Sequence, residues 1–133
     1  MARIARGFTL IELMIVLVVA AIIITIAIPA YQAQMRKSRR SEAQAALGSL
    51  VLKQEQYRAN NPSYATTAQL VIPPIDHYDL AVTAQSATGF TMTATAKSGD
   101  DQNNDRGSGT GCATLTVQSA GGAQSRTPTG CWQ

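Results

Sequence analysis

The chain has 133 residues, of which 45% are hydrophobic and 14% are charged, and its formal net charge is +3. This length allows one domain and not two, and so small a charge gives no general argument for a nucleic-acid-binding class. The large aliphatic residues are concentrated before Pro29, whereas the C-terminal part is rich in Thr, Ala, Ser and Gly.

A long apolar segment runs from Phe8 to Ile28 and contains one charged residue, Glu12, and neither glycine nor proline. At about 1.5 Å per residue, a helix of this length crosses a hydrocarbon layer of roughly 30 Å. We therefore expect a transmembrane helix over residues 8–29. The alternative is the core helix of a soluble protein, but the remaining chain is too small to cover such a helix on all sides.

Pro29 need not end this helix, because a helical pattern of apolar residues resumes after it. The apolar residues at three- and four-residue spacing are Ala43, Ala46, Leu47, Leu50, Val51 and Tyr57. The residues expected on the polar face are Arg36, Lys37, Arg39, Arg40, Gln44, Lys53 and Gln56. The pattern predicts one helix from about Phe8 to Ala59, apolar all round in its first half and amphipathic in its second.

The second half of the chain has the pattern of a small sheet. Residues 78–84 and 90–96 each alternate between apolar and polar side chains around a turn, which predicts an antiparallel hairpin. A polar loop over 98–111 precedes a third predicted strand at 113–117, and a short fourth strand within 119–133 is an open alternative. The expected fold class is therefore α+β, with one long helix packed on a small antiparallel sheet.

The residues Arg6-Gly7-Phe8-Thr9-Leu10-Ile11-Glu12-Leu13 resemble the class III signal of type IV prepilins and pseudopilins. The resemblance implies the pilin fold and a short leader, residues 1–7, which a prepilin peptidase removes by cutting between Gly7 and Phe8. It also implies methylation of the new Phe8 amine. An ordinary secretory signal fits less well, because its apolar region is usually about 7–15 residues long.

Glu12 stands within the apolar span, where an unpaired carboxylate costs about 2–3 kcal/mol. It lies four residues from Phe8, so the two fall on nearly the same helix face. The resemblance implies that Glu12 neutralises the N-terminal amine of a neighbouring subunit during assembly. Snorkelling of the side chain to the membrane interface is the alternative.

Two signals in the sequence disagree on how the chain is oriented in the membrane. Two basic residues precede the apolar segment, whereas Arg36, Lys37, Arg39 and Arg40 follow it, so the positive-inside rule alone favours the reverse orientation. The resemblance instead places the leader in the cytoplasm and the head, residues 30–133, in the periplasm, and after assembly in an extracellular filament. We expect the basic cluster to be a solvated helix face or a headgroup contact. Filament packing and DNA contact are the alternatives.

The two cysteines, Cys112 and Cys131, do not form a C-x-x-C motif, and the only histidine, His77, is distant in sequence. This does not fit a structural zinc site. The upstream membrane segment implies an oxidising compartment and so favours a disulfide, and pilin heads typically carry a C-terminal disulfide. Short motifs at Asn61–Ala65, Cys112–Thr116 and Cys131-Trp132 resemble minor pilins of the PilE type.

The polar loop has alternating oxygen donors at Asp101, Asn103 and Asp105, as a calcium loop does. It departs from the EF-hand pattern, because Arg106 occupies the glycine position and Cys112 replaces the bidentate glutamate. We therefore expect a hydrated turn, with calcium binding as the alternative, and we predict no cofactor. The sequence contains no recognisable catalytic motif, so we expect a protein that is not an enzyme.

The expected function is that of a minor pilin in a type IV pilus used for twitching, adhesion or DNA uptake. Its expected partners are the prepilin peptidase, other pilin subunits and the lipid of the inner membrane. A type II secretion pseudopilin and a major pilin are alternatives from the same family. A filament-tip module that binds DNA or a surface is the alternative from another class, and its candidate cations are Lys97, Arg106 and Arg126.

Overall fold

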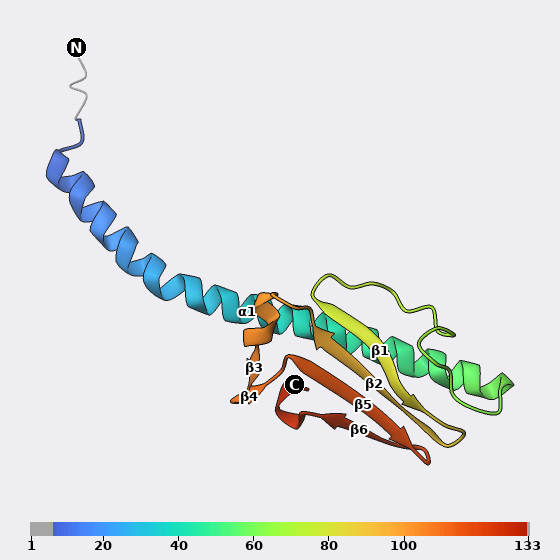
Figure 1. Ribbon diagram of the computed structural model, residues 1–133. Helices are drawn as coiled ribbons and strands as arrows, with labels where there is room; N and C mark the ends of the chain where they lie inside the picture. Colours follow the sequence, from blue (N-terminus) through green and yellow to red (C-terminus); the bar gives the residue numbers. More distant parts are fainter. Residues whose placement is uncertain (1–6, 133) are drawn as a thin grey trace, which may run out of the picture. The chain divides into compact units, whose positions relative to one another are not determined.

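A computed structural model describes residues 7–132 of the chain. The elements in chain order are α1 (Leu10–Asn60), β1 (Tyr78–Gln85), β2 (Gly89–Ala96), η1 (Asp101–Asn104), β3 (Arg106–Gly107), β4 (Thr110–Gly111), β5 (Thr114–Ala120), β6 (Ala123–Thr127) and η2 (Thr129–Cys131) (Figure 1). The chain divides into two compact units, Met1–Gln34 and Met35–Gln133. The second unit lies within the predicted head, and we keep the word head for residues 30–133.

Helix α1 has the bounds that the sequence predicts to within two residues, and it continues through Pro29. It begins after Thr9, whose hydroxyl oxygen accepts a hydrogen bond from the Glu12 amide at 3.2 Å, as an N-cap does. At its other end the Asn61 side chain donates to the carbonyl of Tyr57 at 2.8 Å, and Pro62 follows. Polar side chains at both ends thus satisfy backbone groups that the helix leaves unpaired.

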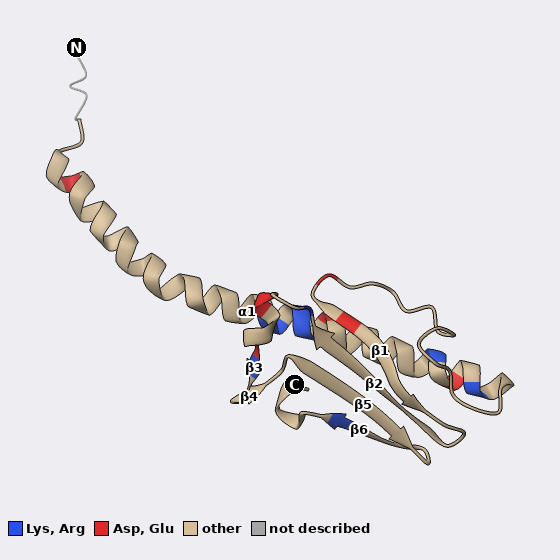
Figure 2. Cartoon of the chain, in the orientation of Figure 1, with Lys and Arg blue, Asp and Glu red and all other residues tan. Residues whose placement is uncertain are grey.

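The first half of α1 is apolar on all sides. Its large apolar side chains from Phe8 to Ile28 are all at least 50% exposed, and Glu12 is the one charged residue among residues 7–34 that the structure describes (Figure 2). This segment is long and apolar enough to cross a membrane. Its apolar side chains are not buried against other described residues of the chain, so the segment does not have the packing of a soluble core helix.

The head contains a four-stranded antiparallel sheet in the order β1-β2-β5-β6 (Figure 1). Met92 pairs with Val82 on one side and with Val117 on the other, and Val117 pairs with Arg126 of β6. The predicted hairpin and third strand are confirmed. The sequence predicted a fourth strand within 119–133 only as an alternative, and β6 is that strand. All five of its side chains are exposed, so its sequence has no apolar alternation to indicate a strand.

One hydrophobic core joins the second half of α1 to the sheet. The fully or nearly fully buried members include Ala43, Leu47, Leu50, Phe90, Met92, Ala94, Leu115 and Val117. The α+β pilin fold predicted from the sequence is therefore confirmed. Two details differ from the predicted helix faces, because Ala46 and Tyr57 are only partly buried and Arg40 is buried at 5% exposure.

A buried glutamine fixes the segment between α1 and the sheet. The Gln54 side-chain amide donates to the carbonyl of Ala65 at 2.9 Å and accepts from the Ala65 amide at 2.8 Å. Nearby, the ring of Tyr64 packs edge-on against Phe90 with 4.8 Å between ring centroids. Both polar atoms of the Gln54 amide are satisfied, which is what allows a polar side chain at a core position.

Candidate functional site

The residues predicted for cleavage and assembly lie in the first unit, and residues 1–6 of the predicted leader lie outside the described residues. Gly7 and Phe8 precede α1, and Glu12 lies in its first turn with its side chain exposed. A carboxylate in the first turn is favourably placed relative to the helix dipole. A side chain at Gly7 would meet no atom within 4 Å, so packing within this chain gives no reason for glycine at that position.

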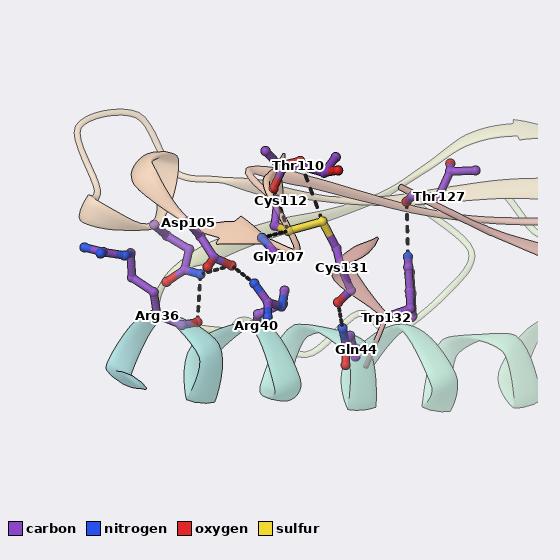
Figure 3. Close-up of a disulfide and its surroundings, with 12 residues drawn as sticks. Arg36, Arg40, Gln44, Asp105, Gly107, Thr110, Cys112, Thr127, Cys131 and Trp132 are labelled. Carbon is purple, nitrogen blue, oxygen red and sulfur yellow. Dashed lines mark hydrogen bonds and ion pairs between the residues drawn. A yellow bond between two sulfur atoms is a disulfide. The ribbon is translucent and has the colours of Figure 1, made fainter. Parts of the chain in front are cut away.

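The C-terminal part of the head is held by a disulfide between Cys112 and Cys131, both of which are fully buried (Figure 3). The Gln44 side-chain amide on α1 donates to the carbonyl of Cys131, so the disulfide region is also attached to the helix. Gly107 passes directly over the bridge, and a Cβ atom there would lie 2.9 Å from the Cys112 sulfur and clash with the carbonyl oxygen of Gly130. Only a residue without a side chain fits this close approach.

The basic cluster on α1 is not the solvated face that we expected from the sequence. Asp101 contacts Arg36 at 2.9 Å. Asp105 contacts Arg40 at 2.6 Å (Figure 3). Asp100 lies 4.0 Å from Arg39. The correction has a simple cause, since the aspartates are more than sixty residues away in sequence and helical periodicity cannot reveal partners from another element.

The three ion pairs differ in exposure. The Arg40 and Asp105 side chains are 6% and 4% exposed, whereas the Asp101 side chain is 48% exposed. The buried pair is further satisfied by Gln102, whose side-chain amide donates to Asp105 at 3.1 Å and to the carbonyl of Arg36 at 2.9 Å. Full pairing and hydrogen bonding are what make a buried charge tolerable.

The outer aspartates are ionised at neutral pH. The hydrogen bonds from His77, which lies 2.8 Å from Asp100, and from the Gln102 amide hold the pKa of Asp100 below its ordinary value. The hydrogen bond from Arg36 lowers the pKa of Asp101 in the same way. A lowered folded pKa means that the stability these groups contribute is present above their unfolded pKa of about 3.9. That contribution is lost as the pH falls through the folded value.

The donors that suggested a calcium loop do not converge on one point. Asp101 and Asp105 contact different arginines, and the Asn103 side-chain amide donates to the carbonyls of Lys97 and Asp100. Within residues 7–132 there is no group of three or more His, Cys, Asp or Glu side chains arranged to hold a metal ion. The loop is a surface turn in which Asp101, Asn103 and Asn104 are exposed. What the sequence did not show is that Asp101 and Asp105 pair with arginines of α1.

The three head cations that the sequence suggested for DNA are not equally available. The Lys97 ammonium is partly buried and donates to the carbonyl of Ile75 at 2.8 Å. Arg106 and Arg126 are exposed, and the Arg126 guanidinium lies over the ring of Trp132 at 5.4 Å from its centroid. Neither arginine forms an ion pair with another residue that the structure describes.

Family comparisons cover nearly the whole region from the apolar segment to β5. Residues 3–28 match the model of the prokaryotic N-terminal methylation motif, which implies processing by a prepilin peptidase. Residues 29–116 match the model described as type IV minor pilin ComP, DNA uptake sequence receptor. The second match contains the second half of α1, both strands of the hairpin and the whole loop that pairs with the arginines.

Two characterised relatives are similar over shorter stretches. The chain is 37% identical over 70 residues to the type IV wide pilus major component PilA4 of Thermus thermophilus, a region that covers 53% of each chain. It is 51% identical over 41 residues to the fimbrial protein EcpC of Eikenella corrodens, covering 31% of this chain and 27% of that protein. The aligned regions thus span about half and about a quarter of these relatives.

The apolar first half of α1, the sheet packed on its second half and the two family matches agree with one another. They confirm the pilin family expected from the sequence. The chain belongs to the family of the type IV minor pilin ComP.

Proposed function

We propose that this pilin is a minor subunit of a type IV pilus whose head binds DNA. The observation that carries the proposal is the ComP match over residues 29–116, because it falls on the head and its description is that of a DNA uptake sequence receptor. The DNA-binding module that the sequence analysis gave as an alternative to a pilin is therefore included in this proposal, because a pilin head can itself bind DNA.

The proposal includes the path by which the subunit reaches the filament. Residues 1–7 are the leader, the peptidase cuts between Gly7 and Phe8, and the Phe8 amine is methylated. Residues 8–29 hold the subunit in the inner membrane and then in the filament core, and residues 30–133 form the head on the periplasmic side. The exposed apolar side chains of residues 8–28 support this, since they need lipid or other helices around them.

The cations best placed to contact DNA are Arg106 and Arg126. Both are exposed and neither is neutralised by a carboxylate among the described residues. A guanidinium binds phosphate oxygens through paired donors, and the ring of Trp132 beside Arg126 is of the kind on which bases stack. By contrast, the partly buried Lys97 already donates to a backbone carbonyl.

The test measures binding of the processed full chain, in micelles of an uncharged detergent, to a fluorescent DNA duplex at several salt concentrations. The Arg106→Gln/Arg126→Gln variant is expected to bind more weakly and to reduce the slope of log affinity against log salt by about 1.8, because each phosphate contact contributes about 0.9. The Lys53→Gln/Lys97→Gln variant has the same charge change and is the control, since the two ammonium groups donate to the carbonyls of Val71 and Ile75. Equal loss in both variants, or no binding by the parent protein, would contradict the proposal.

A further inference from the structure

We infer that the helix segment Arg36–Arg40 is a second surface for the phosphate backbone of DNA, and that the loop Asp100–Asp105 keeps it masked. We call these two parts the basic segment and the acidic loop. The acidic loop places a carboxylate at each of three arginines, where phosphates would otherwise bind. With DNA as the polyanion, this inference rests on the proposed function.

The basic segment has the spacing of a phosphate-binding surface. Arg36 and Arg40 are four residues apart on α1, and Arg36 and Arg39 are three apart, so their side chains project from adjoining positions of one helix. Lys37 is exposed and forms no ion pair within residues 7–132. Figure 2 shows the positive charges of this segment directly beside the negative charges of the acidic loop. Without the loop, four cations within five residues would face an incoming anion.

The exposure of the pairs divides the acidic loop into a fixed and an exchangeable part. The Arg40–Asp105 pair is buried and also bonded to Gln102, so it anchors the loop. The Arg36–Asp101 pair is exposed on its acidic side, and the Arg39–Asp100 pair is at the 4.0 Å limit of an ion pair. Ion pairs that water reaches contribute little net stability. Another anion can therefore replace Asp101 at Arg36 and compete with Asp100 for Arg39. Asp100 keeps its hydrogen bonds with His77 and the Gln102 amide, and Asp105 stays in place.

Masking by the acidic loop means that the four cations of the basic segment do not form an exposed positive patch on the head. An unmasked segment would attract any polyanion, including membrane headgroups, whereas a masked one responds only to a ligand that already contacts the head. A duplex held at Arg106 or Arg126 would have the high local concentration needed to compete with the two outer carboxylates.

The experiment neutralises the mask and leaves the arginines intact. Asp100→Asn/Asp101→Asn keeps the side-chain oxygen that caps η1, since asparagine caps as well as aspartate does. The processed full chain in uncharged micelles is expected to elute from heparin at higher salt than the parent protein. Its slope of log affinity for duplex DNA against log salt is expected to steepen by about 1.8 as two arginines become free.

The matched control is Asp76→Asn/Asp79→Asn, which makes the same charge change at two exposed carboxylates that face no arginine among the described residues. It is expected to shift the heparin elution much less than Asp100→Asn/Asp101→Asn, which we call the mask variant. Equal shifts in the two variants would overturn the inference, because they would reflect net charge alone. If the mask variant unfolds, Asp101→Asn alone tests the same point, with an expected steepening of about 0.9.

The heparin result separates this inference from the proposed function. A parent protein that binds no duplex, together with a mask variant that gains heparin affinity over its control, would refute DNA binding by the native head and still show a masked basic segment. A parent protein that binds duplex through Arg106 and Arg126, with no gain from removing the mask, would support the proposed function and refute this inference.

Discussion

Replacing Glu12 with alanine is expected to leave processing nearly normal and to reduce incorporation of the subunit into filaments by roughly tenfold to a hundredfold. After the proposed cleavage, the Phe8 amine is a positive charge that enters apolar surroundings, and the Glu12 carboxylate of another subunit is its proposed partner. An unpaired charge there costs about 2–3 kcal/mol, and each 1.4 kcal/mol is a factor of ten. The measurement compares the cleaved subunit in the membrane with the subunit in sheared filaments.

Thr25→Ala is the matched control for this variant. Thr25 is also a polar residue of the apolar half of α1, and its hydroxyl donates to the carbonyl of Ile22 at 2.7 Å within the same helix. Its loss leaves no charge without a partner, so incorporation is expected to stay close to that of the parent protein. If Glu12→Ala enters filaments as well as Thr25→Ala does, Glu12 is a snorkelling residue and has no role in assembly.

Asp105→Asn is expected to lower the free energy of unfolding of the head by about 3–5 kcal/mol. The substitution leaves the Arg40 guanidinium, which is 6% exposed, without its anion in a buried position. Asp105 also accepts from the Gln102 side chain, and that bond loses its charged partner. Trp132, the only tryptophan of the chain, reports the transition by fluorescence in urea at neutral pH with the full chain in uncharged micelles.

Two further variants establish the cause of that effect. Asp101→Asn makes the same chemical change at an exposed ion pair of the same loop, and it is expected to change stability little. Arg40→Met/Asp105→Leu removes both charges together and is expected to recover most of the loss, since well-packed apolar residues can replace a buried pair. An Asp105→Asn protein as stable as Asp101→Asn would show that the buried pair does not anchor the acidic loop.

The parts of the fold that the sequence predicts well are those with a regular apolar period. Helix α1 follows from an apolar run that continues into a three- and four-residue pattern at Ala43, Leu47 and Leu50. The hairpin follows from alternation in β1 and β2, because one face of each strand is buried. Strand β6 has all its side chains exposed, so the information that forms it lies in its backbone pairing with β5.

The acidic loop was harder to predict, because what orders it comes from elsewhere in the chain. The short element η1 within it, and β3 and β4 directly after it, have no apolar pattern. Arg36 and Arg40 hold the loop, and the disulfide holds the residues that follow it. The alternation of oxygen donors resembled a calcium loop, and only the positions of the arginines show which partners those oxygens have. The sequence does show a basic cluster and an acidic loop of opposite charge. Charge alone, however, does not predict which arginine pairs with which aspartate.

Mass spectrometry of the N-terminus in sheared filaments tests most directly whether this chain is a processed subunit of a type IV pilus. We expect a subunit that begins at Phe8 and is heavier than the bare peptide by one methyl group. A chain in the filament that still begins before Gly7, or filaments without this subunit at all, would contradict it.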